Sequence, residues 1–331
     1  MTSTPSHHRW GFSEVFLLQF FPCPVALCVR KEHLDAPSLA PRPFLCYPFF
    51  VMQNDALKHE VRSWWDAHPF AYLIEGEEEG SWSFFRNVDR KVMKWMSPWA
   101  HTRYPLLSNL VDFSALKGKR VLDIACGTGW STEQFVRAGA IVTAIDLTPK
   151  AVELTKKRLA LYGLQATVLE ADAEQLPFPD GSFEYVMAWG CLMHTPNTAG
   201  AIKEIYRVLA PGGKGGAMMY NKHSIHWYWG IWFHRGILEG KLLKMNEQEL
   251  ANRYTDGVDV GGNMLTKFFS PKQFFQLFAL FPKRRVRIFD RPEVADYLPS
   301  MRLPLGRVLP KSVKRWIAYR WGQTAWIDFE K

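Results

Sequence analysis

The run Asp123-Ile124-Ala125-Cys126-Gly127-Thr128-Gly129 closes a short apolar segment and precedes a segment with helical periodicity. Glycines at the end of a strand allow the backbone to approach a ligand closely, and the helix that follows aims its free N–H groups at that ligand. Asp146 ends the next apolar segment, 19 residues after Gly127. A carboxylate at that place accepts hydrogen bonds from ribose hydroxyls. The spacing therefore predicts a site for a ligand that contains a nucleoside.

A dinucleotide would use the same two features, but two details argue against it. The third glycine of a dinucleotide loop is absent, because the chain continues Trp130-Ser131-Thr132. Asp123 lies inside the apolar segment, where an anion does not suit a pyrophosphate but does suit the ammonium group of an amino-acid-bearing sulfonium. A purely structural role remains an alternative for two acids. Asp123 could cap local N–H groups, and Asp172, an acid further along the chain, could be a turn residue before Pro177.

Five segments together resemble the motifs of class I S-adenosylmethionine-dependent methyltransferases. They are 121–129, 144–149, 170–173, 180–186 and 207–213. The set is most similar to the type 11 domain group that contains the ubiquinone and menaquinone C-methyltransferases. The resemblance covers about residues 118–220. It implies S-adenosylmethionine as cofactor and methyl transfer as activity, and it specifies cofactor and fold better than acceptor.

The resemblance also implies which residues contact the cofactor, with Asp146 at the ribose and Asp172 at the adenine amine. These residues are Asp123, Cys126, Gly127, Thr128, Gly129, Asp146, Leu147, Asp172, Ala173 and Trp189. Cys126 is expected to be a small loop residue rather than a reactive thiol.

Methyl transfer is an in-line displacement at a sulfonium carbon, so no metal site is expected. Positioning the reactants can supply about 7–11 kcal/mol of the barrier, and removing a proton from the acceptor adds a smaller factor. His194, just after the fourth expected strand, is the candidate base or acceptor-orienting residue. Its alternative role is a helix cap before Pro196. Tyr220 and His223, after the fifth expected strand, are further candidates in the same cleft.

Other activities compete with a small acceptor. Amino-methylating enzymes of this fold carry Asn/Asp-Pro-Pro-aromatic after the fourth strand, whereas this chain has Trp-Gly-Cys-Leu at 189–192. Cys191 could serve as the nucleophile of a cytosine-5 RNA enzyme, but it lacks a preceding proline and a second suitably placed thiol. An RNA or protein methyltransferase that uses the basic C-terminal region is the main alternative, although no motif of a known RNA-binding module is present. A non-catalytic S-adenosylmethionine-binding protein is a further one.

The elements that must position these residues alternate between strands and helices from residue 118. Strands are expected at 120–125, 141–146, 167–170, 183–189 and 216–220, with helices at 131–138, 149–162 and 198–209. This alternation predicts a doubly wound α/β fold with a parallel sheet covered on both faces. The resemblance implies seven strands, mostly parallel, with a last strand at 324–329 inserted antiparallel beside 216–220.

Five regions are predicted along the chain: a poorly ordered extension (1–51), a helical cap (52–117), the cofactor-binding core (118–220), an insertion that covers the substrate (221–268), and a helix with strands that complete the sheet (269–331). Trp229, Trp232 and Phe233 share one helical face of the insertion, and we expect it to close over a small apolar or aromatic acceptor such as a quinone, a lipid or a related metabolite. The same rings could instead pack on the N-terminal helices or lie in a membrane interface.

Composition bears on the partners and the compartment. The chain has a net charge of +9, and residues 281–331 hold 12 Lys and Arg against 5 Asp and Glu, a local charge of +7. Such a segment is either a solvated basic face or a surface that attracts anionic lipid or nucleic acid. Nucleic acid is not the expected partner. The five cysteines fit no disulfide framework or zinc site, so a cytoplasmic protein with reduced thiols is expected. Peripheral contact with a membrane is a further expectation.

Overall fold

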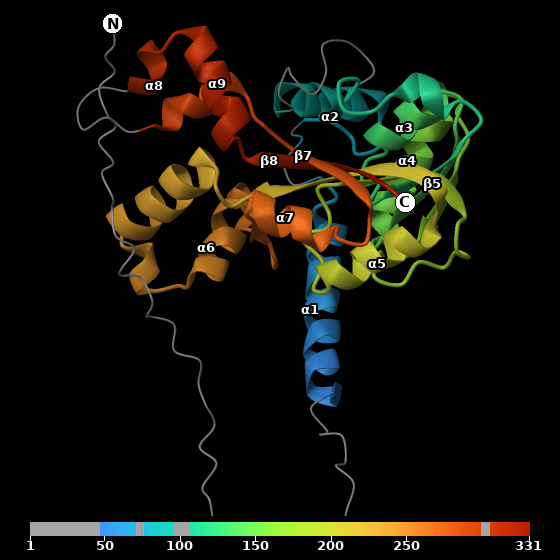
Figure 1. Ribbon diagram of the computed structural model, residues 1–331, viewed down its shortest axis with the longest axis horizontal. Coiled ribbons are helices and arrows are strands. Elements are labelled where there is room, and N and C mark those ends of the chain that lie inside the picture. Colours follow the sequence, from blue (N-terminus) through green and yellow to red (C-terminus); the bar gives the residue numbers. More distant parts are fainter. Residues whose placement is uncertain (1–46, 71–73, 75, 96–105, 299–304) are drawn as a thin grey trace, which may run out of the picture. The chain divides into compact units, whose positions relative to one another are not determined.

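The computed structural model describes residues 47–70, 74, 76–95, 106–298 and 305–331 (Figure 1). The predicted N-terminal extension lies outside the described residues except for its last five positions, which belong to helix α1 (Tyr47–Ala67). The rest of that helix lies in the predicted helical cap.

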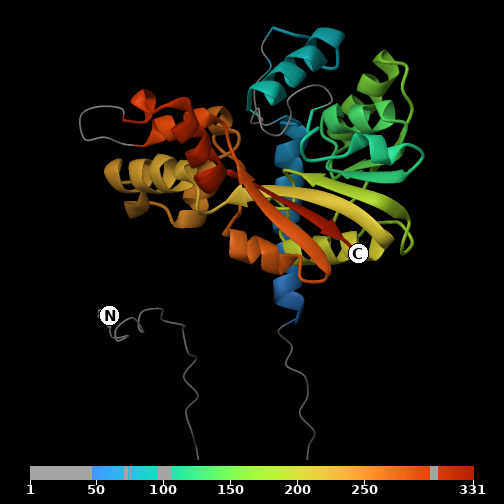
Figure 2. The same cartoon turned by 45° about the horizontal axis from the view of Figure 1, so that its top comes forward.

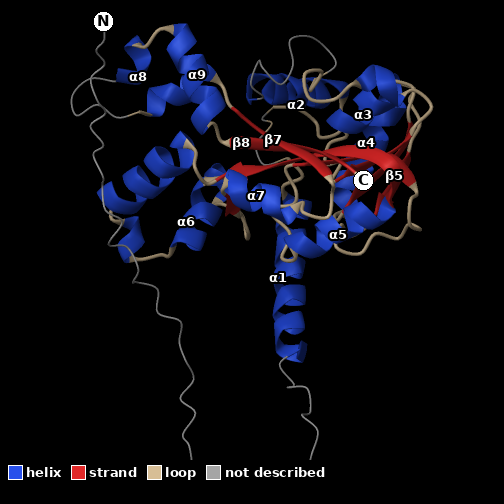
Figure 3. Ribbon diagram, viewed as in Figure 1, coloured by secondary structure: helices blue, strands red, loops and turns tan. Residues whose placement is uncertain are grey.

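One mixed sheet forms the centre of the described chain (Figure 3). Its strands are β1 (Arg120–Ile124), β2 (Ile141–Asp146), β3 (Thr167–Glu170), β4 (Phe183–Trp189), β5 (Leu209–Asn221), β7 (Lys283–Phe289) and β8 (Thr324–Glu330), in the order β3-β2-β1-β4-β5-β8-β7. The short β6 (Phe268–Phe269) pairs with the end of β5. β8 runs antiparallel to both of its neighbours, so the predicted place and direction of the last strand are confirmed.

Two glycines of β5 allow β8 to lie close. A Cβ on Gly216 would come within 1.9 Å of the Trp326 ring, and one on Gly215 within 2.3 Å of the Phe329 ring. The missing side chains therefore leave the space that these two rings fill, and Trp326 is fully buried. β5 begins at Leu209 rather than at the expected residue 216, and the pairing with β4 shifts register between the partners Leu209 and Lys214.

Helices cover both faces of the sheet, as the alternation predicted (Figure 1). On one face α5 (Thr198–Val208) and α7 (Pro271–Leu277) enclose an apolar cluster of Ile, Val and Phe side chains. On the other face α3 (Trp130–Arg137), α4 (Pro149–Leu161) and α2 (Trp82–Trp95) enclose a second cluster. Local signals set the helix starts: Thr148 caps α4 ahead of Pro149, and Ser270 forms a capping box with Gln273 at α7.

A second group of helices lies beyond the carboxyl ends of the parallel strands (Figure 2). The segment after β5 forms η2 (His226–Leu238), η3 (Lys241–Leu243), α6 (Glu247–Tyr254) and η4 (Val258–Val260). The segment after β7 forms η5 (Pro292–Tyr297), α8 (Leu305–Val308) and α9 (Lys311–Trp321). The 3-10 helix η1 (Phe113–Leu116) precedes β1.

The aromatic face expected at residues 229–233 is arranged differently. η2 has π-type geometry, so its residues repeat with a longer period than those of an α-helix. Its buried side is formed by Trp227, Ile231 and Gly236, which are spaced by four and five residues. Trp229 is exposed and packs edge-on against Phe233, and the Trp232 indole donates a hydrogen bond to Glu247.

A buried arginine joins the three helices of one face. Arg158 of α4 donates through Nε to Glu133 of α3 at 2.7 Å and through Nη2 to both carboxylate oxygens of Asp89 of α2, at 2.7 and 2.8 Å. The side chain of Arg158 is 2% exposed. Removing Arg158 takes away the ion-pair partner of Asp89, while Glu133 keeps its pair with Arg137.

We expect Arg158→Ala to lower the free energy of unfolding by about 3–5 kcal/mol, because it leaves the partly buried carboxylate of Asp89 without its ion-pair partner and removes the link between the three helices. Urea titration of the full chain measures this change. Lys157→Ala is the matched control, since Lys157 makes a half-exposed i,i+4 pair with Glu153 and should change stability by less than about 1 kcal/mol. Equal losses in the two variants would contradict the role assigned to Arg158.

Candidate functional site

A cavity of about 570 Å³ lies at the carboxyl ends of β1, β2, β4 and β5. Its volume falls in the usual range for a small-molecule site, and its position is the one at which open α/β sheets bind ligands. The lining comes from the strand ends, from α1, and from the helices that follow β5 and β7. The sheet thus brings together residues that are distant in the sequence.

The glycine loop is held at one end of this cavity by Asp146. Its Oδ2 accepts a hydrogen bond from the backbone N–H of Gly127 at 3.0 Å, and its Oδ1 accepts from the N–H and the hydroxyl of Thr148, both at 3.0 Å. Burial raises the pKa of Asp146, while these donors oppose the shift. Gly129 has a φ of +74°, and a Cβ there would lie 3.1 Å from the backbone of Thr155. The loop therefore rests tightly on α4, which explains the need for glycine.

Asp123 is placed below the loop rather than in the cavity. It is buried, and its Oδ2 accepts hydrogen bonds from the hydroxyls of Ser131 at 2.8 Å and Thr132 at 2.7 Å, in the first turn of α3. Burial raises its pKa to about 6. Asp123 therefore joins β1 to the start of α3, and it does not line the cavity where the ligand's ammonium group was expected to meet it.

The other predicted cofactor residues divide into two groups. Cys126, Thr128 and Gly129 do not line the cavity, and Cys126 and Gly129 instead lie against Thr155 of α4. Those that do line it are Gly127, Asp146, Leu147, Asp172, Ala173 and Trp189. The lining group comes from the ends of β3, β2, β1 and β4, which are neighbours in the sheet, as expected for an extended nucleoside ligand.

Two basic residues of α1 reach across to the same end of the cavity. Lys58 makes ion pairs with Asp172 at 2.7 Å and Glu174 at 2.6 Å. Arg62 donates to the backbone carbonyl of Leu147 at 3.1 Å and pairs with Glu170. Sequence reasoning did not find Lys58, because a helical lysine 114 residues from its partner gives no local signal.

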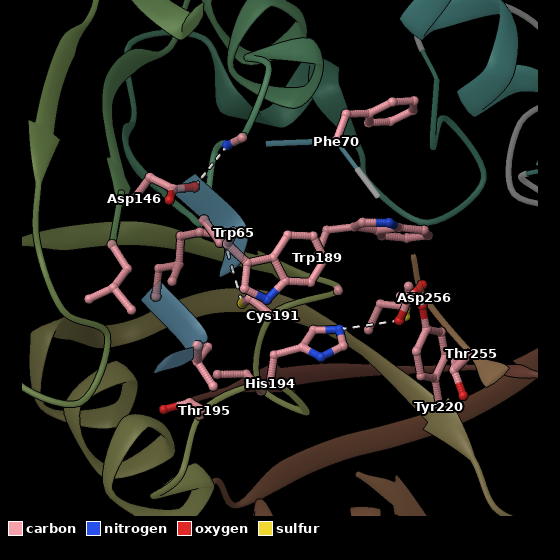
Figure 4. A pocket seen from close by; sticks show the side chains of 18 of the residues that line it. Trp65, Phe70, Asp146, Trp189, Cys191, His194, Thr195, Tyr220, Thr255 and Asp256 are labelled. Atoms are coloured by element: carbon pink, nitrogen blue, oxygen red, sulfur yellow. Dashed lines mark hydrogen bonds and ion pairs between the residues drawn. The ribbon is translucent and has the colours of Figure 1, made fainter. Parts of the chain in front are cut away.

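His194 and Tyr220 meet at the other end of the cavity, together with Asp256 (Figure 4). His194 Nδ1 lies 2.6 Å from the carbonyl oxygen of Leu265, and its Nε2 lies 3.5 Å from Asp256 Oδ2. The Tyr220 hydroxyl donates to Asp256 Oδ1 at 2.9 Å. The Trp65 ring lies beside the imidazole, with 5.1 Å between ring centroids. The cap of α5 is Asn197, so His194 does not have its alternative role.

Asp256 was not among the predicted site residues. It stands in Thr255-Asp256-Gly257, which looks like an ordinary turn in the sequence. Its contact with Tyr220 and His194 arises only because the segment after α6 folds back over the strand ends.

The insertion contributes to the cavity through other residues than its tryptophans. His226, Tyr254, Thr255, Asp256 and Val258 line the cavity. Trp229, Trp232 and Phe233 do not, and neither does His223, which stacks on Tyr228. The aromatic cover predicted from residues 229–233 is therefore absent from the described lining.

Cys191 lines the cavity but is poorly suited to act as a nucleophile. Burial raises the pKa of its thiol far above the usual range, so little thiolate forms at neutral pH. This agrees with the sequence argument against a cytosine-5 mechanism.

The central part of the chain is similar to known proteins. Residues 121–213 match the family described as a methyltransferase domain. A demethylmenaquinone methyltransferase of Tropheryma whipplei is 37% identical over 97 residues, which cover 29% of this chain and 40% of that protein. Another, from Thermus thermophilus, is 35% identical over 128 residues, which cover 34% of this chain and 58% of that protein. The chain thus spans less than two thirds of the length of either relative.

Among solved structures, the fold is similar to that of an S-adenosylmethionine-dependent methyltransferase from Methanosarcina mazei, with a TM-score of 0.46 and 19% identity over 69% of this chain and 98% of the other. This TM-score is too low for the similarity to say anything about the function of the chain. In the part of the chain that the structure describes, no helix combines the length and apolar character that crossing a membrane requires.

The position of Asp146 leads to a test of the cofactor site. Asp146→Asn keeps the shape of the side chain but removes its charge and one acceptor, so we expect it to weaken binding of S-adenosylhomocysteine by about 1–3 kcal/mol, or roughly 5- to 150-fold. Calorimetry on the full chain measures the affinity. Glu153→Gln, an equal charge change on the exposed side of α4, is the control and should leave affinity unchanged. If Asp146→Asn and the parent protein bound S-adenosylhomocysteine equally well, Asp146 would have no role in binding it.

Proposed function

We propose that this protein, which carries a methyltransferase domain at residues 121–213, transfers a methyl group from S-adenosylmethionine to a small, largely apolar or aromatic acceptor. One observation carries the proposal: a single cavity joins the glycine loop and Asp146 at one end to His194, Tyr220 and Asp256 at the other. Such a cavity can hold a nucleoside-bearing methyl donor and an acceptor in line, which is the main requirement of the reaction.

The character of the acceptor end supports the second half of the proposal. Trp65 lies beside His194, and Met218, Phe289 and Val294 are further apolar residues of the cavity lining. These side chains suit a ring or a short hydrocarbon rather than a charged polymer. The names of the two bacterial relatives point the same way, so a quinone or a related hydroxylated aromatic is our preferred acceptor.

The basic C-terminal region gives less support to an RNA or protein substrate. Several of its cations are paired inside the molecule: Lys283 with Glu330, Arg287 with Asp328 and Lys314 with Asp296. Lys331 donates to the backbone carbonyls of Tyr206 and Leu209. These four of the twelve cations are thus engaged inside the molecule, although the acids of the three pairs belong to the same region and its net charge stays +7.

We further propose that α9 contacts an anionic lipid surface, from which an apolar acceptor is taken. The helix carries four basic residues and no acidic one. The Trp316 side chain is 59% exposed and packs edge-on against Trp321. Exposed tryptophan beside arginine is the combination that favours the headgroup region of a bilayer. The free thiols of Cys126 and Cys191 suit a reducing compartment, so we place this contact on the cytoplasmic side.

The activity is tested with methyl-tritiated S-adenosylmethionine and a cell lysate separated into lipid, small-molecule, RNA and protein pools. We expect label in the lipid or small-molecule pool, and in a purified short-chain demethylated naphthoquinol. Label confined to RNA or protein would favour the alternative substrates. Tight cofactor binding without label in any pool would identify a non-catalytic binding protein.

The membrane contact is tested by sedimentation with vesicles of phosphatidylcholine containing phosphatidylglycerol. Each basic residue near such a surface contributes about 1 kcal/mol, so Arg315→Gln with Arg320→Gln should weaken partitioning by roughly 30-fold. Arg90→Gln with Lys94→Gln, an equal change on exposed positions of α2, should have little effect. The same partitioning to pure phosphatidylcholine, or no partitioning at all, would refute the contact.

A further inference from the structure

Three polar side chains from separate elements form one buried cluster in the acceptor end of the cavity (Figure 4). His194 follows β4, Tyr220 lies in β5, and Asp256 follows α6. Asp256 is 3% exposed and His194 is 5% exposed. A buried carboxyl and a buried imidazole at a ligand cavity are costly unless they are partnered, so the partners of each atom are informative.

The hydrogen bonds fix the tautomer of His194. A carbonyl oxygen can only accept, so the 2.6 Å contact with Leu265 places a proton on Nδ1. In the neutral ring Nε2 then has a lone pair directed at Asp256 Oδ2. Asp256 Oδ1 already accepts from Tyr220, whereas Oδ2 has no hydrogen-bond partner among the described residues. Two acceptor atoms therefore face each other, and a proton between them satisfies both.

A third group can approach these two atoms together from the cavity. Nε2 and Oδ2 are 3.5 Å apart, beyond the usual length of a hydrogen bond. Both residues line the cavity, so an O–H or acidic C–H of a bound acceptor can approach both atoms. The Trp65 ring packs on the imidazole and limits its motion.

We propose that Asp256 and His194 form a paired base that takes the acceptor's proton during methyl transfer, with Tyr220 orienting the Asp256 carboxylate. This inference rests on the proposed function. The acceptor's electron pair forms the bond to the methyl carbon, and the pair of the breaking S–CH₃ bond passes to sulfur, which becomes neutral. The acceptor's proton enters the gap between Nε2 and Oδ2. Loss of that proton to water after product release restores the base.

Neighbouring charges set the proton affinity of the pair. Burial lowers the pKa of His194 and raises that of Asp256, and each residue's charge opposes the shift of the other. Lys267, which donates to the carbonyls of Thr195 and Pro196, further lowers the pKa of His194. The active form is the pair without its shared proton, so the rate should rise with pH and reach a plateau.

The test uses Asp256→Asn in the full chain, with the acceptor that the labelling assay identifies. We expect kcat to fall by about 100-fold or more, the usual contribution of a general base. The rising limb of the pH profile should move to lower pH, because the imidazolium loses its anionic partner. Asp256→Glu should restore part of the rate. Asp259→Asn, an exposed change three residues away in η4, should leave rate and profile unchanged.

A second measurement needs no acceptor. In protein labelled with ¹⁵N-histidine, NMR should show His194 with its proton on Nδ1, and its titration should move to lower pH in Asp256→Asn; His194→Gln assigns the signal. Asp256→Asn should bind S-adenosylhomocysteine as the parent protein does. A parent His194 protonated on Nε2 alone, or an active Asp256→Asn with an unchanged pH profile, would overturn the inference. A parent protein with the expected NMR titration but no methyl transfer would instead count against the proposed function.

Discussion

The hydrogen bond from the Gly127 N–H to Asp146 joins the ends of two adjacent strands, and the cofactor half of the site depends on it. β1 and β2 are paired in register, so Asp146 reaches the loop that leaves β1 without any distortion of the sheet. The loop can then rest on α4, where only glycine fits beside Thr155. Asp123, in β1 just before the loop, binds the first turn of α3, which follows the loop. Asp146 therefore both holds the loop and lines the cavity, so a change that loosens the loop should affect stability and binding together.

Patterns with short range predicted most of this arrangement. The signals there are local: the alternation of strands and helices, the glycine loop, and the threonine and proline at the start of α4. They therefore predicted β1 to β5 and the helices between them. The place of β8 came from the family resemblance, because periodicity alone does not say which strands pair. Asp123 shows the limit of such reasoning: its presence in β1 was informative, but the hydroxyls of Ser131 and Thr132 decide where its carboxylate points.

The acceptor half depends on contacts between distant segments, and the sequence was a poorer guide there. Asp256 is 36 residues from Tyr220 and 62 from His194, and nothing in its surroundings marks it. The tryptophans of η2 predicted an aromatic face at 229–233, whereas the π-type geometry buries Trp227, Ile231 and Gly236. Lys58 and Arg62 show the same effect from the N-terminal side, since α1 supplies cations to Glu170 at the end of β3 and to Asp172 just after it.

The place of β8 in the sheet has a consequence for synthesis on the ribosome. β5 remains an exposed sheet edge until residues 324–330 have emerged, more than 100 residues later. During that time Gly215 and Gly216 have no rings above them, and Met218 and Tyr220 belong to an unsupported wall of the cavity. A nascent chain can therefore form β1 to β4, with their side of the cavity, well before the acceptor end exists. Folding of this protein should be slow at its last step and vulnerable to strand pairing with other chains before Trp326 is in place.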